Sequence, residues 1–266
     1  MDTTPAAARI RIFDERVDAV TPAAVLAFAA RRIASGQKGL VLNHNVHSLA
    51  LIRRNPAMRA AYAHADLIEA DSTPLILWAR MLGKPISRAH RATYLDWRDD
   101  FWRLAAQNQW RVFYLGSAPG VAERAASSLR AEWPGVQIAV QHGYFDMDAD
   151  NQAVLTAISD YRPDIIFVGM GMPRQEAWIA ANYGALESGV VFSLGAAFDY
   201  EAGVQRAAPR WTGRFGLEWL FRFVADPKRL FERYFIEPWM LLPSMMRDLV
   251  EVLRQRGRPN EADASL

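Results

Sequence analysis

The sequence predicts an α/β fold in which helices flank a mostly parallel sheet, followed by a basic and aromatic helical appendage. Six short apolar runs alternate with stretches of helical periodicity over the first 205 residues. This alternation is typical of βαβ units, whose strands lie parallel. Polar and glycine clusters follow nearly every run, and beyond residue 205 the alternation gives way to segments rich in Arg, Trp and Phe.

Local signals place the elements. Thr21 can cap a first helix that Gly36 ends. Pro173 pre-sets the backbone for the first turn of a later helix without losing a needed donor. The predicted strands span residues 39–43, 67–70, 111–115, 136–141, 165–168 and 189–194. The predicted helices span residues 21–35, 46–65, 74–82, 96–108, 120–132 and 151–161, with one more beginning at Pro173.

Composition argues against several classes of protein. With 266 residues, 51% of them hydrophobic, the chain can bury one large core and carry an appendage. A net charge of +2 argues against nucleic acid as the main partner, and the lack of cysteine excludes disulfides and thiolate sites. No charge-free apolar run approaches the ~18 to 20 residues of a spanning helix, and residues 1–10 lack a secretory pattern. We therefore expect a cytoplasmic protein.

A domain boundary is predicted near residues 203–206, which separates an α/β domain (1–205) from the appendage (206–266). Between Arg206 and Arg233 there are seven Lys or Arg against three Asp or Glu, interspersed with Trp and Phe. The segment can be a solvated basic helix face. It can also be an interfacial element, with aromatic side chains in the headgroup zone and Arg facing anionic lipid. The interspersed aromatic residues favour the interfacial interpretation.

The polar and glycine clusters should share one edge of the sheet. Ligands bind at the carboxyl ends of the strands in an open parallel sheet, so this placement predicts an enzyme or a ligand-binding protein. The candidate residues that follow strands are Asn43, Asn45, Asp71, Gly116, His142, Gly169, Gln175 and Asp199.

Asp71 is the candidate general base, placed to take a proton from a sugar hydroxyl. It could instead cap the helix that Pro74 opens. Asn43 and Asn45 could hold sugar hydroxyls, a base or a phosphate oxygen, or could serve turn and capping roles. The spacing of nearby histidines and Asp71 matches no metal-ligand signature, so we expect no metal.

The remaining candidates also have two interpretations each. The turn that begins at Gly116 could cradle a phosphate or be a plain tight turn, since it matches neither common nucleotide signature. His142 could serve a diphosphate leaving group or be structural. Gln175, at a helix start after Gly169, carries both a donor and an acceptor that suit a sugar or base edge, near free helix N–H groups.

Several sequence blocks together resemble the WecG/TagA/CpsF family, glycosyltransferase family 26. The match runs in order from about residue 40 to 234. The blocks Pro-x-Gln-Glu-x-Trp, which ends at Trp178, and Gly-Leu-Glu-Trp, which ends at Trp219, are the most specific. The other matching blocks include Ala70-Asp71, the Gly-x-x-Pro-Gly turn at 116–120, His-Gly-Tyr-Phe at 142–145, Phe198-Asp199 and Pro-Lys-Arg-Leu at 227–230.

The resemblance implies a Rossmann-like catalytic domain and an inverting, metal-independent hexosyltransferase without a cofactor. Such an enzyme moves a sugar from a UDP-sugar to a polyprenyl-diphosphate-linked sugar acceptor, at the inner face of the bacterial cytoplasmic membrane, in exopolysaccharide or cell-wall polymer synthesis. The catalytic aspartate of the family corresponds to Asp71, with Asn45, Gln175 and Arg91 as further site residues. The candidates for the lipid diphosphate are Arg214, Arg222, Arg229 and Arg233.

Two departures from the family pattern bear on the donor. The family usually has Thr where this chain has Asn43, and a Gly where it has Tyr94, next to the predicted site. The change from Gly to the larger Tyr would alter the volume of the pocket. It argues against UDP-N-acetylmannosamine as the donor and makes another UDP-hexose, such as UDP-glucose, plausible. A non-catalytic module that binds nucleotides or sugar phosphates is the alternative function.

Overall fold

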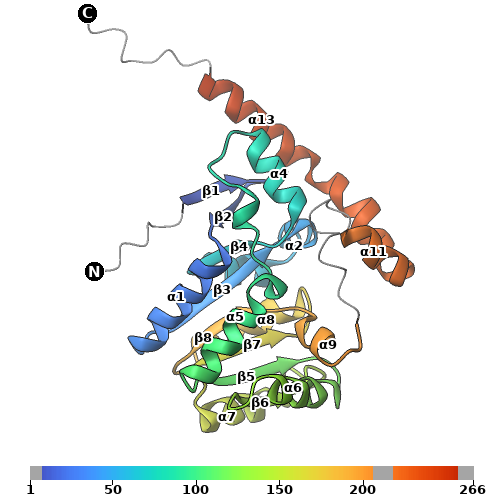
Figure 1. The fold of residues 1–266 in the computed structure, drawn as a ribbon. Coiled ribbons are helices and arrows are strands. Elements are labelled where there is room, and N and C mark those ends of the chain that lie inside the picture. The colour runs from blue at the N-terminus through green and yellow to red at the C-terminus, as the bar shows by residue number, and fades with distance from the viewer. Residues whose placement is uncertain (1–7, 206–217, 257–266) are drawn as a thin grey trace, which may run out of the picture.

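The computed structural model describes residues 8–205 and 218–256, except the side chains of Glu218, Arg229 and Arg256. It contains one sheet of six strands, all parallel, in the order β4-β3-β8-β7-β5-β6 (Figure 1). The strands are β3 (Gly39–His44), β4 (Leu67–Ala70), β5 (Arg111–Gly116), β6 (Gln137–Gln141), β7 (Ile165–Gly169) and β8 (Val190–Ser193). The predicted α/β class and all six predicted strands are confirmed.

Helices cover both faces of this sheet. One face packs against α1 (Pro22–Ala34), α5 (Tyr94–Gln107), α6 (Val121–Glu132) and α9 (Ala197–Glu201). The other packs against α2 (Val46–Ile52), α3 (Pro56–His64), α7 (Asn151–Tyr161) and α8 (Arg174–Asn182). Strand β7 shows why two cores form: Phe167 enters the first, while Ile166 and Val168 enter the second. Successive side chains of a strand point to opposite faces, so a strand buried on both sides is apolar throughout.

Two parts of the prediction were wrong in detail. The helix predicted over 46–65 is two helices, because Pro56 opens α3 and the Asn55 side chain accepts from the Met58 N–H at 3.0 Å. The chain also begins with an unpredicted antiparallel hairpin, β1 (Ala8–Ile12) and β2 (Glu15–Ala19). Its turn residues Phe13 and Asp14 both have positive φ.

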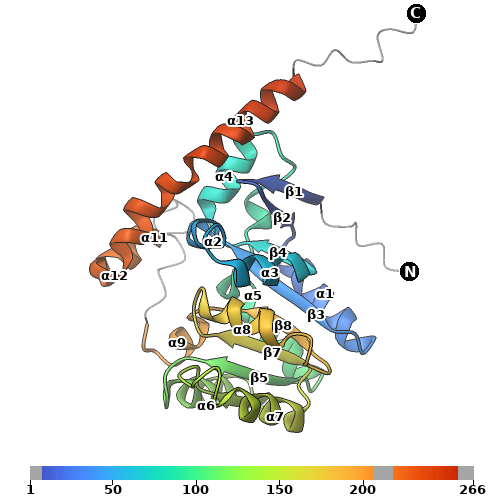
Figure 2. The same ribbon diagram turned by 180° about the vertical axis from the view of Figure 1, so that it is seen from behind.

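The C-terminal segment is helical where it is described, as predicted. After α11 (Glu218–Ala225) and α12 (Pro227–Phe231) the chain passes through two short helical segments, η2 (Glu232–Ile236) and η3 (Glu237–Leu241). The last helix, α13 (Leu242–Arg256), lies across the β4 end of the molecule beside α4 (Thr73–Met81) in both views (Figures 1 and 2). We refer to residues 218–256 as the C-terminal helices.

Polar contacts attach these helices to the N-terminal hairpin and to α4. The buried carboxylate of Asp248 on α13 accepts from the Phe13 N–H at 2.9 Å and from the Trp78 indole N–H at 2.8 Å. Arg53 donates to the Met240 carbonyl at 2.8 Å. Because a buried carboxylate is costly without partners, the two bonds to Asp248 fix the position of α13. The N-terminal hairpin therefore contacts α13.

Candidate active site

Asp71 lies at the carboxyl end of β4, and its carboxylate does not cap the following helix. The N-cap position of α4 is Ser72, whose side chain makes no capping bond. The Asp71 N–H donates to the His44 carbonyl at 2.9 Å, which joins the ends of β4 and β3. The Asp71 carboxylate instead accepts from the Asn45 amide at 3.5 Å. Of the two interpretations from sequence, capping is not the role of this side chain here.

Asn45 acts as a cap and also faces Asp71. Its Oδ1 accepts from the Ser48 N–H at 3.0 Å, and the Ser48 hydroxyl lies 2.9 Å from the Asn45 N–H. This reciprocal capping box fixes which end of the amide points at the helix. The Nδ2 end is consequently directed at Asp71.

Three arginines act electrostatically on Asp71. Arg91 is brought there by the backbone, because Ala70 and Arg91 form a parallel bridge and the Ala92 N–H donates to the Ala70 carbonyl at 3.2 Å. Arg222 of α11 and Arg233 of η2 come from the C-terminal helices, and both favour the ionised form of Asp71. The site is therefore formed by residues at the carboxyl edge of the sheet together with residues of the C-terminal helices.

Burial raises the pKa of Asp71 to about 6, against the effects of Arg222, Arg91, the Asn45 amide and Arg233, which lower it. The carboxylate is thus ionised at neutral pH but retains an affinity for a proton. A general base works best when its pKa lies near the operating pH. Burial also lowers the pKa of the Arg233 guanidinium below its usual value.

Of the four candidates for the lipid diphosphate, the structure describes the side chains of two. Arg222 and Arg233 lie beside Asp71, and η3, which follows Arg233, is tied to α2 by a 2.6 Å contact between His47 and Glu237. Arg214 lies outside the described residues, as does the side chain of Arg229, so the structure does not place these two predicted residues.

The glycine loops after β5 and β7 pack closely against each other. A Cβ on Gly116 would lie 2.4 Å from the Gly169 carbonyl oxygen, and one on Gly169 would lie 2.5 Å from the Tyr114 hydroxyl. Both distances are far below van der Waals contact, so only glycine fits at these positions. Contacts within the protein therefore explain why glycine is required at these two positions. Phosphate binding by these loops stays a prediction.

Gln175 is fully buried and holds together the loops that follow β7 and β8. Its Oε1 accepts from the Gly171 and Gly195 N–H groups, both at 3.2 Å, and its Nε2 donates to Glu176 at 2.7 Å. Its own N–H donates to the Gly171 carbonyl at 2.9 Å. These bonds use both ends of the amide. The structure therefore gives Gln175 a supporting role behind the loops, and direct contact with a ligand stays a prediction.

Three other predicted residues have defined positions at the same edge. Asp199 on α9 accepts from the Ser117 hydroxyl at 2.7 Å. Asn43 donates to the Ser193 carbonyl at 2.8 Å, which links β3 to β8. His142 follows β6 and is half-buried. Asn43 and Asp199 thus stabilise the edge of the sheet, whereas Asn45 and Arg91 meet Asp71.

Sequence reasoning missed two residues near Asp71. Tyr200 of α9 lies under Arg222, whose guanidinium carbon is 5.9 Å from the centre of the ring. Glu69 is buried, its carboxyl accepts from the Trp97 indole at 3.2 Å, and burial together with Asp71 raises its pKa well above the usual value. Tyr200 follows Asp199 directly, so the cluster after β8 could have indicated it.

Tyr94, which replaces a family glycine, does not occupy the space in front of Asp71. Its ring belongs to the core between the sheet and α5, and its hydroxyl donates to Glu201 at 2.6 Å. The expected loss of pocket volume at this position is therefore absent.

The described residues contain neither a cluster suited to a metal ion nor a helix that could span a membrane. Within residues 8–205 and 218–256, no three or more His, Asp or Glu side chains are grouped so as to hold a metal ion. In the same ranges no helix is both long and apolar enough to cross a bilayer.

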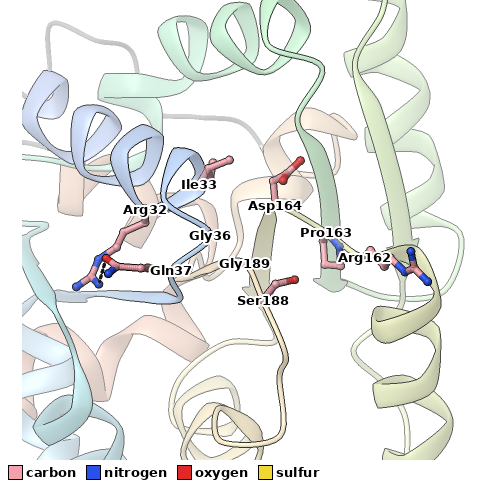
Figure 3. A pocket seen from close by; sticks show the side chains of 9 residues that line it. All are labelled: Arg32, Ile33, Gly36, Gln37, Arg162, Pro163, Asp164, Ser188 and Gly189. Carbon is pink, nitrogen blue, oxygen red and sulfur yellow. Dashed lines mark hydrogen bonds between the residues drawn. The ribbon is translucent and has the colours of Figure 1, made fainter.

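A small hollow lies at the opposite end of the sheet from Asp71. Figure 3 shows Arg32 and Gln37 bonded to each other at one end of it, Arg162 at the other, and Asp164 between them. Its residues precede β3, β7 and β8, so it faces the amino ends of the strands. Ligands of open parallel sheets bind at the other edge, so we do not assign the substrate to it.

Comparison with known proteins identifies the family of this chain. Residues 10–255 match the model of the glycosyl transferase WecG/TagA/CpsF family. The chain is also similar to N-acetylglucosaminyldiphosphoundecaprenol N-acetyl-beta-D-mannosaminyltransferase of Staphylococcus aureus strain NCTC 8325. They are 31% identical over 203 residues, which are 73% of this chain and 78% of the relative. The protein of strain COL gives the same values. The chain therefore belongs to the WecG/TagA/CpsF family of glycosyltransferases.

Proposed function

We propose that this protein is an inverting, metal-independent hexosyltransferase of family 26 that uses a UDP-sugar donor, of the UDP-glucose or UDP-N-acetylmannosamine type. The acceptor is a sugar linked to a polyprenyl diphosphate, and the product serves exopolysaccharide or cell-wall polymer synthesis. The observation that carries this proposal is the convergence of Arg91, Arg222 and Arg233 on a carboxylate of raised pKa, Asp71. A base next to several cations suits a reaction between two diphosphate-containing substrates.

In this mechanism Asp71 accepts the proton of the acceptor hydroxyl while the hydroxyl oxygen bonds to the anomeric carbon of the donor. The bond from that carbon to the diphosphate oxygen breaks, and UDP leaves with the electron pair from the opposite face, so the configuration inverts. Asn45 holds the Asp71 carboxylate in place. The arginines stabilise negative charge on the diphosphates, which is the kind of preorganised electrostatic contribution that dominates many enzymes.

The C-terminal helices are proposed to rest on the membrane that carries the acceptor. On α13, Asp248 and Ser244 face the protein, while Arg247 and Arg254 are exposed. A separate exposed stripe at helical spacing is apolar and consists of Leu242, Met246, Leu249, Val250 and Leu253. An amphipathic helix with basic residues beside an apolar stripe is typical of a peripheral membrane contact.

Sedimentation with anionic vesicles tests the membrane contact. The variant Leu249→Gln with Leu253→Gln should lose most of its vesicle binding. Tyr144→Gln is the matched control, because Tyr144 is 74% exposed but follows β6, at the far edge of the sheet from β4. Equal sedimentation of all three proteins would contradict the membrane proposal.

The activity is tested by mass spectrometry with a panel of UDP-sugars and a lipid-linked monosaccharide, with EDTA present. Product should form, and Asp71→Asn should lower turnover by roughly 10²- to 10⁴-fold while UDP affinity is retained. UDP binding without product from any donor would favour the alternative of a non-catalytic module. A wild-type rate for Asp71→Asn would show that the base is assigned wrongly.

A further inference from the structure

Helix α9 holds three consecutive side chains against three different parts of the molecule. Asp199 bonds the Ser117 hydroxyl of the loop after β5, at 2.7 Å. Glu201 accepts from the Tyr94 hydroxyl and from the Arg98 Nε, both at 2.6 Å. Between these two anchors lies Tyr200, half-buried, with its ring facing Arg222. The anchors on either side fix the position of this ring.

The ring of Tyr200 lies within reach of a cation–π contact. The Arg222 guanidinium carbon is 5.9 Å from the ring centre, inside the ≈ 6 Å at which such pairs attract. Arg222 also acts electrostatically on Asp71. Tyr200 thus touches, from the α/β domain, the part of α11 that reaches the candidate base.

We propose that Tyr200 is a positioning residue, which holds the Arg222 guanidinium over Asp71 through its aromatic face and so joins the C-terminal helices to the candidate base. This inference rests on the proposed function. Tyr200 would not touch the reacting atoms. Its contribution would be to keep one of the three cations near Asp71 in place.

The pH profile depends on the charged and titratable groups that face Asp71 and Tyr200. Burial raises the pKa of the Tyr200 phenol above its usual value, so the phenol stays protonated between about pH 5 and 9. A change in pH dependence in that range would therefore report on Asp71. Among residues 8–205 and 218–256, the groups that interact with Asp71 or Tyr200 include Asn45, Tyr62, Glu69, Arg91, Arg222, Arg233 and Tyr234.

The test is the pH profile of kcat/KM, which reports the pKa of the base in the free enzyme. A nearby cation lowers a carboxyl pKa by 1 to 3 units, so displacing one of several should raise it by about one unit. Tyr200→Leu should therefore move the acid limb up by about one pH unit. When each profile is scaled to its own plateau above about pH 8, kcat/KM of the variant at pH 6 should be about fivefold below that of the wild type.

Two further variants separate the ring from the hydroxyl and from the fold. Tyr200→Phe keeps the aromatic face and should restore the wild-type limb. Arg222→Met removes the other partner and leaves α9 unchanged, so it should give the same shift as Tyr200→Leu. The double variant should show no additional shift, because both changes remove one contact. Thermal unfolding of each variant checks that the fold is kept.

Each outcome decides one question. An unmoved limb in Arg222→Met, a limb that moves in Tyr200→Phe as far as in Tyr200→Leu, or additive shifts in the double variant would overturn the role of Tyr200. If Tyr200→Leu does not fold, Arg222→Met and Tyr200→Phe decide alone. Absence of transfer by the wild type, or full activity of Asp71→Asn, would instead overturn the proposed function, whatever Tyr200 does.

Discussion

At the β4 end of the sheet, side chains from several segments converge on Asp71, whereas near β7 the polar side chains bond the loops around them. Asn45, Arg91, Arg222 and Arg233 act on one carboxylate. Gln175, in contrast, is fully buried and uses both ends of its amide to hold Gly171, Gly195 and Glu176. About three strand spacings, roughly 14 Å, separate β4 from β7. The first region is where we propose that the chemistry takes place, and the side chains of the second hold the loops in their conformation.

The largest test of this contrast is to remove the cations from the first region. Arg222→Met with Arg233→Met should lower kcat/KM for the lipid-linked acceptor by roughly 10²- to 10³-fold, since charge stabilisation of this kind has that magnitude. Affinity for UDP, measured by calorimetry, should change little. Arg31→Met is the control, because Arg31 is exposed in the last turn of α1, which leads into the amino end of β3, at the opposite edge of the sheet from Asp71. A similar loss in the control would mean that general charge, rather than the two residues, matters.

The second region should respond in stability before activity. Gln175→Leu leaves the Gly171 and Gly195 N–H groups without their acceptor. An unsatisfied buried donor costs roughly 1 to 3 kcal/mol, so the free energy of unfolding should fall by about 2 kcal/mol or more in urea titrations. Gln152→Leu, at an exposed position of α7, should have almost no effect. Unchanged stability with lost substrate binding would show that Gln175 is a ligand contact after all.

The pH dependence of activity also distinguishes the two regions. Asp71 must be ionised to accept a proton, and its pKa is raised to about 6. The rate should therefore be level above about pH 7 and fall about tenfold for each unit below about pH 6. Glu176 in the second region also has a raised pKa, about 7, caused by burial. Glu176→Gln should leave the acid limb in place, and a shift would implicate the second region in the titration.

The smallest expected effect concerns Asn43, which was predicted to bind substrate. Its amide donates to the Ser193 carbonyl at 2.8 Å. Asn43→Ala should lower the free energy of unfolding by about 1 kcal/mol, the net value of a typical hydrogen bond. The KM values for donor and acceptor should stay within about twofold. A large rise in either KM would place Asn43 in the binding surface.

The sequence was most informative where a single local pattern decides the structure. Apolar runs between helices predicted all six strands, and Thr21 caps α1 by accepting from the Ala24 N–H at 3.2 Å. It was less informative where the partner of a side chain lies far along the chain. No local sequence pattern indicates that the Gln175 side chain bonds the Gly195 N–H, or that the Phe13 N–H in the hairpin turn donates to Asp248 of α13. These depend on tertiary contacts, which periodicity does not encode.

The residues of the candidate site also differ in whether a local sequence pattern predicts them. Asp71 could be located because polar residues at the ends of parallel strands share one edge. That it contacts Asn45 and interacts with arginines about 150 residues later, instead of capping α4, could not be predicted, because no local rule predicts such distant contacts. Resemblance to a family supplied Asp71 and the basic helices together. Tyr200 had no such signal beyond following Asp199.

The bond between the Phe13 N–H and Asp248 joins positions 235 residues apart in the chain. Contacts of such long separation form late in folding, because the loop entropy must be overcome before they contribute. The hairpin is synthesised before α13 and cannot form this bond until about 235 further residues have been added. Arg222 and Arg233, which act on Asp71, belong to the same late segment, so the proposed site would be complete only after the C-terminal helices have been made.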